Sequence, residues 1–133
     1  MHRATEKTTL HDRIIQIVAS ANNETFEVHT NPSSNKNWFI SEGEEKYFPD
    51  VILLPKGASR STIIIEVETD ESVNEEHAGD QWEPYARLGR KFYLLVPSGC
   101  LSNAKTICYW KGIGAHFGEY WWDGTRWAVR FED

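Results

Sequence analysis

The chain has 133 residues, of which 40% are hydrophobic and 13% aromatic, so it is long enough for one domain with a proper core. Its formal net charge of −6 argues against a broad basic face for gripping duplex DNA, although it does not exclude a local basic patch. Two cysteines without a C-x-x-C spacing, Cys100 and Cys108, indicate packing residues rather than a disulfide framework or a thiolate metal site. We expect a single domain over residues 1–133. Because no apolar run could serve as a signal peptide or cross a bilayer, we also expect a soluble, cytoplasmic protein with no membrane partner.

Helical periodicity predicts an amphipathic helix near the start of the chain, from Leu10 to Ala21. Thr9 and Asp12 have the spacing of a capping box, and the asparagines that follow Ala21 would end the helix. Two short strands and an exposed polar loop are expected next, at residues 26–30, 38–40 and 41–45.

The strongest β pattern lies in the middle of the chain, where "KYFPDVILL" and "TIIIEVET" flank the turn-rich segment "PKGASRS". We expect a hairpin here. A helix from about 72 to 88 follows, capped by Ser72 and Glu75 and stopped by Gly89, and Pro84 inside it would either kink it or start a second turn. Its apolar stripe is expected to contain Ala78, Trp82 and Tyr85.

The rest of the chain predicts a buried strand, a helix and a final hairpin. "KFYLLVP" (residues 91–97) is the buried strand, and with the preceding strand and helix it would form a right-handed parallel crossover. Residues 101–111 predict the helix, and Asp123-Gly124 the two-residue turn of a C-terminal hairpin. The order indicates an α/β sandwich around a mixed sheet.

Aromatic residues alternate along that last hairpin and would share one face. The residues predicted to share it are His116, Tyr120, Trp122, Trp127, Val129 and Phe131. This pattern favours core packing over a platform for stacking sugars or bases.

Carboxylates accumulate at the end of the strand "IIIEVETDE". Because side chains alternate across a strand, Glu66 and Glu68 are expected on the face of Ile64, about 7 Å apart. A strand that simply emerges into solvent would also tolerate these charges. The acids, however, continue an apolar face, which is unusual for a solvated surface.

The partner strand is predicted to add a third carboxylate. If the hairpin is symmetric about Ala58, Val51 pairs with Ile65 and Asp50 lies opposite Glu66. Directly opposed side chains lie about 5 Å apart, and like charges there are destabilising unless they are neutralised. Hard oxygen ligands of this kind suit Mg²⁺ or Mn²⁺, which stabilises charge on a phosphodiester and lowers the pKa of bound water.

These motifs resemble the PD-(D/E)xK nuclease superfamily. The resemblance consists of Pro49-Asp50, "EVE" at 66–68 and the element order over residues 10–97; the segment 81–85, "QWEPY", is also similar to the Q-x-x-x-Y signature of exonuclease-like members. It implies a restriction endonuclease-like αβββαβ core with a mixed sheet flanked by helices, plus a C-terminal helix and β-hairpin.

The resemblance also implies roles for individual residues. Asp50 and Glu66 would be metal ligands, and Gln81 and Tyr85 would belong to the site. Glu68 stands where the family usually has a lysine, so it would act as a base or as a third metal ligand. A lysine from a neighbouring element could replace the missing charge, and Lys46, on the face of Asp50 by alternation, and Lys91 are the candidates.

Further side chains are candidates from their positions alone. His77 lies one helical turn before Gln81 and would share its direction, although both could simply form a polar helix edge. His11, Asp12 and Glu24 could add a ligand, but nothing local argues for it. The charged residues from Glu66 to Glu83 are acidic, and those from Arg87 to Lys111 are basic. The residues predicted to form a DNA-binding surface are Arg87, Arg90, Lys91, Lys105 and Lys111.

Three functions remain open from the sequence. The preferred one is a Mg²⁺- or Mn²⁺-dependent nuclease acting on DNA. The polar loop at 33–37 would reach the DNA strand, and a homodimer or a partner protein would help to hold the DNA. The second is a catalytically inactive nuclease-fold module for binding or regulation, because the usual lysine is missing and the net charge is negative. The third is a carbohydrate-binding or assembly module that uses the C-terminal tryptophans.

Overall fold

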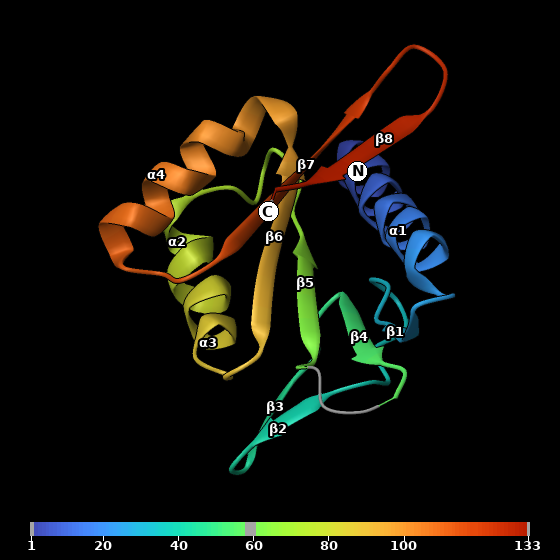
Figure 1. Cartoon of the computed structure of the whole chain (residues 1–133). Coiled ribbons are helices and arrows are strands. Elements are labelled where there is room, and N and C mark those ends of the chain that lie inside the picture. Colours follow the sequence, from blue (N-terminus) through green and yellow to red (C-terminus); the bar gives the residue numbers. More distant parts are fainter. Residues whose placement is uncertain (1, 58–60, 133) are drawn as a thin grey trace.

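The computed structural model describes residues 2–57 and 61–132 and contains a curled mixed sheet of six strands (Figure 1). The order across the sheet is β1-β4-β5-β6-β7-β8. These strands are β1 (Phe26–Thr30), β4 (Val51–Pro55), β5 (Ile63–Val67), β6 (Lys91–Pro97), β7 (His116–Trp122) and β8 (Trp127–Phe131). A separate two-stranded sheet, β2 (Ile40–Glu42) with β3 (Glu45–Tyr47), projects from one end of the molecule.

Strand pairing agrees with the sequence pattern in the centre of the sheet. β4 and β5 are antiparallel, and Val51 lies opposite Ile65, which confirms the predicted register. Ala58, the predicted centre of this hairpin, lies outside the described residues. β5 and β6 run parallel, as predicted for two strands joined by a helix, and β6 and β7 are also parallel.

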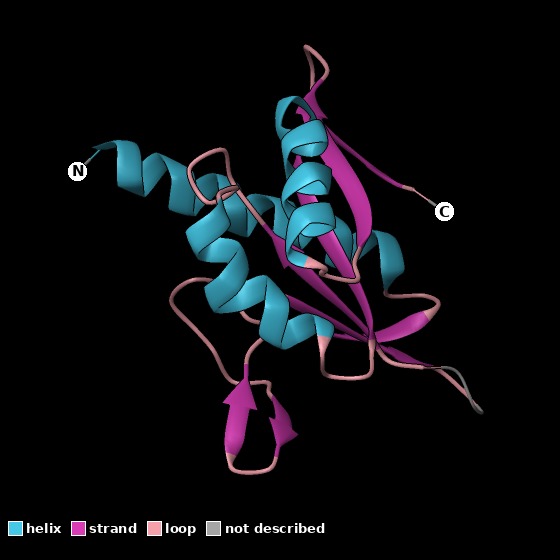
Figure 2. Cartoon of the chain, turned by 90° about the vertical axis from the view of Figure 1, so that its left-hand side faces the viewer, coloured by secondary structure: helices cyan, strands magenta, loops and turns pink. Residues whose placement is uncertain are grey.

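Helices cover both faces of the large sheet (Figure 2). On one face α1 (His2–Asn22) buries Ile14, Ile15 and Val18 against β4, β5 and β6. The other face carries α4 (Leu101–Lys111) and a composite helical segment formed by α2 (Glu75–His77), a π-helix η1 (Ala78–Trp82) and α3 (Glu83–Ala86), while a short 3-10 turn (Ser98–Cys100) leads into α4. In the described part of the chain no helix is both long and apolar enough to cross a membrane.

The first helix is longer than the sequence predicted. It begins at His2 rather than Leu10, so Thr9 lies inside it and the expected capping box is wrong. The Asp12 carboxylate instead accepts hydrogen bonds from the backbone N–H and the hydroxyl of Ser33, at 3.0 and 2.9 Å. A tertiary partner has therefore replaced the local one.

The run "KYFPDVILL" is not one strand. Pro49 lacks a backbone N–H, and β3 ends before it while β4 begins after Asp50. The predicted loop at 41–45 instead contains the end of β2, the start of β3 and the turn between them, with Gly43 at a φ of 63°. Lys46 lies on β3 of the small sheet, and residues 48–50 separate it from β4, so the argument from alternation along one strand was wrong.

The composite segment replaces the single helix predicted from 72 to 88. Asn74, not Ser72, is its N-cap, since the Asn74 side chain accepts from the His77 N–H. Pro84 cannot donate to the carbonyl four residues earlier, and the chain forms a π-helix just before it. The predicted apolar stripe is nonetheless buried, with Trp82 wholly inaccessible to solvent.

The C-terminal hairpin has the predicted faces but a longer turn. Trp122 pairs with Trp127, so four residues rather than two connect the strands, and the Asp123 carboxylate accepts from the backbone N–H groups of Thr125 and Arg126. Tyr120 is buried, whereas Trp122 is 53% exposed at the end of the face. The predicted core-packing face therefore reaches only part of the way along the hairpin.

Candidate functional site

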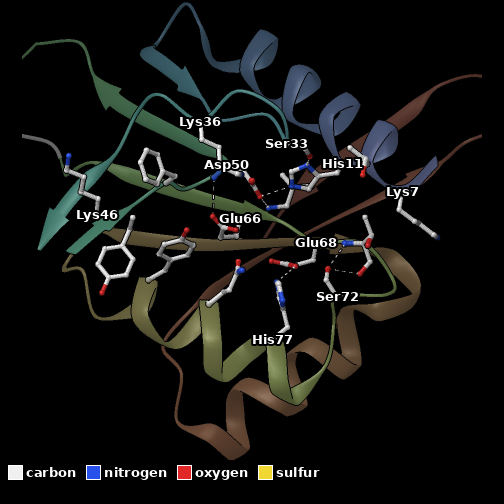
Figure 3. A pocket seen from close by; sticks show the side chains of 17 residues that line it. Lys7, His11, Ser33, Lys36, Lys46, Asp50, Glu66, Glu68, Ser72 and His77 are labelled. Carbon is white, nitrogen blue, oxygen red and sulfur yellow. Dashed lines mark hydrogen bonds and ion pairs between the residues drawn. The ribbon is translucent and has the colours of Figure 1, made fainter. Parts of the chain in front are cut away.

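A cavity of about 560 Å³ opens where β5 ends and β4 begins, between α1 and the composite helical segment (Figure 3). Most of the residues predicted for a site line it: Lys46, Asp50, Glu66, Glu68, His77, Gln81 and Tyr85. They come from β3, from the adjoining ends of β4 and β5, and from the helical segment that follows β5. The cavity is the candidate active site.

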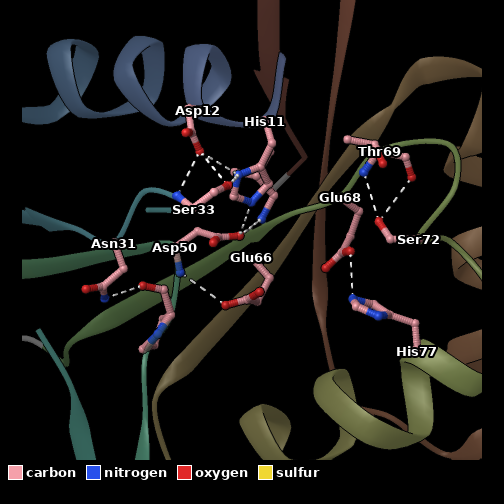
Figure 4. Close-up of polar contacts among 12 residues, drawn as sticks. His11, Asp12, Asn31, Ser33, Asp50, Glu66, Glu68, Thr69, Ser72 and His77 are labelled. Atoms are coloured by element: carbon pink, nitrogen blue, oxygen red, sulfur yellow. Dashed lines mark hydrogen bonds and ion pairs between the residues drawn. The ribbon is translucent and has the colours of Figure 1, made fainter. Parts of the chain in front are cut away.

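Asp50 and Glu66 lie against each other at the strand ends (Figure 4). The Asp50 backbone N–H donates to Glu66 Oε1 at 3.1 Å, and the Val67 N–H donates to Asp50 Oδ2 at 2.7 Å. Asp50 and Glu66 are each only 4% exposed. These reciprocal bonds hold the two carboxylates together beyond the last paired residues of the hairpin.

Crowding of acids changes the protonation of Glu66. Burial, followed by the charges of Asp50 and Glu68, raises the pKa of the Glu66 carboxyl well above its usual range. Taking the proton from Glu66 therefore puts a charge into a dry, already negative place. A cation bound beside Asp50 and Glu66 would remove this cost.

A histidine from α1 provides one positive charge. His11 Nε2 lies 3.1 Å from Asp50 Oδ2, and His11 Nδ1 lies 3.0 Å from Asp12 Oδ1. Burial lowers the pKa of His11, but the hydrogen bonds and charges of Asp50 and Asp12 outweigh burial and raise it to about 9. Protonated His11 donates to a carboxylate with each ring nitrogen.

A second histidine approaches from the opposite layer. His77 Nε2 lies 3.0 Å from Glu68 Oε1, and the buried Trp82 indole donates to Glu68 Oε2 at 3.1 Å. The Glu68 hydrogen bond raises the pKa of His77 against the opposing effect of burial. Both carboxylate oxygens of Glu68 thus have protein donors, and its main-chain carbonyl accepts from the Tyr120 hydroxyl at 2.6 Å.

The helical segment presents three further predicted residues to the cavity. His77, Gln81 and Tyr85 are spaced by four along the chain, and the π-helix lies between the first and the last of them. Gln81 is exposed, so its amide is available to a ligand. Burial and the charges of Glu66 and Asp50 raise the pKa of the Tyr85 phenol, which stays a neutral hydrogen-bonding group.

The candidate lysines divide into two groups. Lys46 lines the cavity, and its Nζ lies 4.6 Å from the centre of the Phe39 ring. Lys91 is the first residue of β6, at the end of that strand away from the cavity, and its Nζ lies 5.4 Å from the centre of the Tyr93 ring. Lys7 and Lys36, which no sequence pattern indicated as site residues, also line the cavity, and Lys7 pairs with Asp70 at 2.6 Å.

The predicted DNA-binding residues lie outside the cavity. Arg87 pairs with Glu83 on the same helix, and Lys105 pairs with Glu132 at 2.8 Å. Arg90 donates to the Leu88 carbonyl, and Lys111 is in the last turn of α4. Their role in DNA binding stays a prediction.

The donor set was tested for a divalent metal ion. Within residues 2–57 and 61–132 no group of three or more His, Cys, Asp or Glu side chains has metal-ligating geometry. Two adjacent carboxylates, Asp50 and Glu66, do open into the cavity. This fits Mg²⁺, which proteins commonly hold through one or two carboxylates while water and phosphate complete its coordination.

Sequence reasoning missed how His11 and Ser33 enter the site. His11 was one of several possible ligands that no local sequence pattern supported. It lies 39 positions before Asp50, and its place beside Asp50 depends on how α1 packs. The apolar spacing of Ile14, Ile15 and Val18 is the one signal that could have found it. These residues define the sheet-facing stripe, one turn from His11.

Comparison with known proteins adds no family assignment. No protein-family model, curated protein or solved structure matches this chain. The function must therefore be argued from the cavity itself.

Proposed function

We propose that this protein is a Mg²⁺- or Mn²⁺-dependent nuclease that hydrolyses phosphodiester bonds in DNA, with a restriction endonuclease-like core of the PD-(D/E)xK type. One observation carries the proposal: Asp50 and Glu66 are buried side by side at the ends of paired strands and open into a common cavity. Neighbouring carboxylates at such a place are costly without a cation.

Asp50 and Glu66 would hold the ion. When bound there, it would lower the pKa of a water molecule and stabilise the charge that develops on the phosphate. Binding would also favour the charged form of Glu66, whose pKa is raised without it. Glu66 would consequently release a proton when the site is loaded.

The remaining residues of the cavity would position the substrate. Gln81 can donate from its amide to a phosphate oxygen or hold a water molecule. Glu68 orients His77 by accepting from its Nε2, and the His77 imidazole would supply the positive charge that the family usually takes from a lysine. Glu68 itself would act through His77 and Trp82 more than as a third ligand, because both of its oxygens have protein donors.

A catalytically inactive binding module is the second candidate. In its favour, every buried side-chain polar atom of the described residues has a hydrogen-bond partner in the protein alone. His11 and the Val67 N–H already satisfy Asp50 Oδ2. A site that is complete in this way does not need an ion for stability.

A cleavage assay separates the two candidates. Purified protein is incubated with supercoiled plasmid, single strands and branched DNA in Mg²⁺ or Mn²⁺. We expect cleavage by the wild type and a loss of at least about 100-fold in Glu66→Gln, because electrostatic stabilisation of the transition state is lost. Glu76→Gln, an exposed carboxylate of α2, is the matched control and should cut normally.

Metal binding is measured in parallel by thermal unfolding. The melting temperature of the wild type should rise with Mn²⁺ concentration, and that of Glu66→Gln should rise much less. Absence of both cleavage and the metal-dependent rise in the wild type contradicts the nuclease and supports the inactive module.

A further inference from the structure

Two aromatic side chains stand exposed next to the candidate active site. Trp38 is 49% exposed and Phe39 45%. One face of Trp38 is covered, since its ring stacks on His29 at a centroid distance of 3.8 Å. Trp38 and Phe39 are consecutive and lie just before β2, and we refer to these two exposed rings together as the aromatic platform.

A buried asparagine holds this platform in place. The Asn31 side chain is inaccessible to solvent; its Oδ1 accepts from the backbone N–H groups of Asn37 and Trp38, both at 2.9 Å. Its Nδ2 donates to the carbonyls of Trp38 and Pro49 at 2.6 and 2.7 Å. The Asn31 N–H donates to the carbonyl of Asp50 at 2.9 Å. One residue therefore fixes the backbone of Trp38 relative to a predicted metal ligand, and Figure 4 shows Asn31 beside that ligand, Asp50.

Contacts continue from the aromatic platform into the cavity. Phe48 lines the cavity and meets Phe39 edge to face at 5.8 Å. Lys46 also lines the cavity, and its Nζ lies over the Phe39 ring. Lys36, from the loop that Asn31 organises, adds a second cation to the wall (Figure 3).

We propose that Trp38 and Phe39 stack on unpaired bases, so that the substrate of this site is a single-stranded stretch of DNA. Aromatic rings bind bases by stacking only when the faces of those bases are free, and in a duplex the neighbouring pairs cover them. Lys36 and Lys46 would meet the backbone between the stacked bases and the phosphate at Asp50 and Glu66. The inference rests on the proposed function and names its substrate class.

The charge of the protein favours a single strand over a duplex. Firm duplex binding depends on many phosphate contacts, which suits a strongly basic face, whereas this chain carries a net charge of −6. Stacking contributes affinity for any base, so part of the binding to a single strand does not depend on phosphate contacts. Two acidic residues, Glu42 and Glu45, lie opposite each other in the register of the β2–β3 hairpin, close to its tip. That tip points away from the large sheet (Figure 1).

The test measures binding without cleavage. Fluorescence anisotropy in EDTA compares a labelled oligothymidylate with a duplex of the same length. We expect the single strand to bind more tightly, and Trp38→Ala and Phe39→Ala each to weaken it by about tenfold. Trp38→Tyr, which keeps an aromatic ring, should restore most of the affinity. Trp110→Ala and Trp122→Ala remove other exposed tryptophans and should bind like the wild type.

Each result has one meaning for the inference. Equal or tighter binding of the duplex overturns it, as does wild-type affinity in both Trp38→Ala and Phe39→Ala. If these variants change the oligomeric state instead, the aromatic platform is a contact between protein chains and the inference is wrong.

The inference and the proposed nuclease fail in different experiments. Single-strand binding that depends on Trp38, without cleavage by the wild type in Mn²⁺, overturns the nuclease only. Cleavage that depends on Glu66, with a preference for duplex, overturns the single-strand inference only.

Discussion

Two carboxylate–histidine pairs flank Glu66 from opposite layers of the fold, and they have similar distances but differ in the helices that carry the histidines. His11 lies 3.1 Å from Asp50, and His77 lies 3.0 Å from Glu68. The His11 side chain is 18% exposed, on a 21-residue helix whose stripe packs on the sheet. His77 is 28% exposed and ends a three-residue helix that leads directly into a π-helix.

The difference indicates separate tasks for the two sides of the cavity. On the α1 side both ring nitrogens of the histidine have carboxylate partners, so His11 mainly balances Asp50 and fixes the strand end. On the other side the pair borders a π-helix, a feature common at functional sites. That side therefore carries the backbone feature that is more often associated with ligand binding or catalysis.

Replacing His11 with leucine should have the largest effect on stability. A histidine pKa of about 9 in place of 6.5 corresponds to roughly 3 kcal/mol of stabilisation. Because the folded pKa is raised, this contribution is fully present below pH 6.5 and is lost as the pH rises through 9. Urea unfolding in EDTA at several pH values should therefore show a large destabilisation of His11→Leu at pH 6 and little at pH 10.

An exposed histidine serves as the control for that experiment. His116→Leu, on β7, should unfold close to the wild type at every pH. A destabilisation of His11→Leu that does not change with pH would mean that His11 contributes by packing alone, and the ion pair with Asp50 would not be the cause.

Replacing Glu66 with glutamine should have an intermediate effect of the opposite sign. Its raised pKa means that the folded protein holds this proton more tightly, so stability falls as the pH rises above the ordinary value of 4.5. Glutamine imitates the protonated form. At pH 8 in EDTA the melting temperature of Glu66→Gln should exceed that of the wild type by roughly 2 to 5 °C.

Saturating Mn²⁺ should reduce or reverse that difference, because it stabilises only the wild type. A variant that melts below the wild type in EDTA would show that the crowding of Asp50, Glu66 and Glu68 costs less than the burial argument requires.

The central hairpin was predictable because its signal is local. Side chains alternate along a strand with a period of two, and together with the length of the loop this sets which residues of β4 and β5 face each other. The pairing of Val51 with Ile65 was predicted in this way and is confirmed. The same arithmetic brought Asp50 next to Glu66. The helix at residues 101–111 was likewise predicted within its observed bounds, since Gly112 adopts the left-handed conformation that ends it.

Features that depend on tertiary contacts could not be predicted. Asn31 looks like an ordinary turn residue in the sequence, yet its side chain donates to a backbone carbonyl 18 positions away. Asp12 serves Ser33 rather than its own helix. The π-helix before Pro84 lies in a segment whose apolar stripe reads as a regular helix.

Replacing His77 with leucine should have the smallest effect on stability and a larger one on function. The Glu68 carboxylate is buried, but the Trp82 indole still donates to it and the His77 side chain is 28% exposed, so the loss should cost less than the roughly 3 kcal/mol expected for His11→Leu. If His77 supplies charge in place of the usual lysine, cleavage should fall by at least about tenfold, while the melting temperature should fall less than in His11→Leu. Cleavage at the wild-type rate would show instead that Lys36 or Lys46, also in the cavity wall, meets that demand. Measuring both quantities for His11→Leu and His77→Leu therefore shows whether the two sides of the cavity really have different tasks.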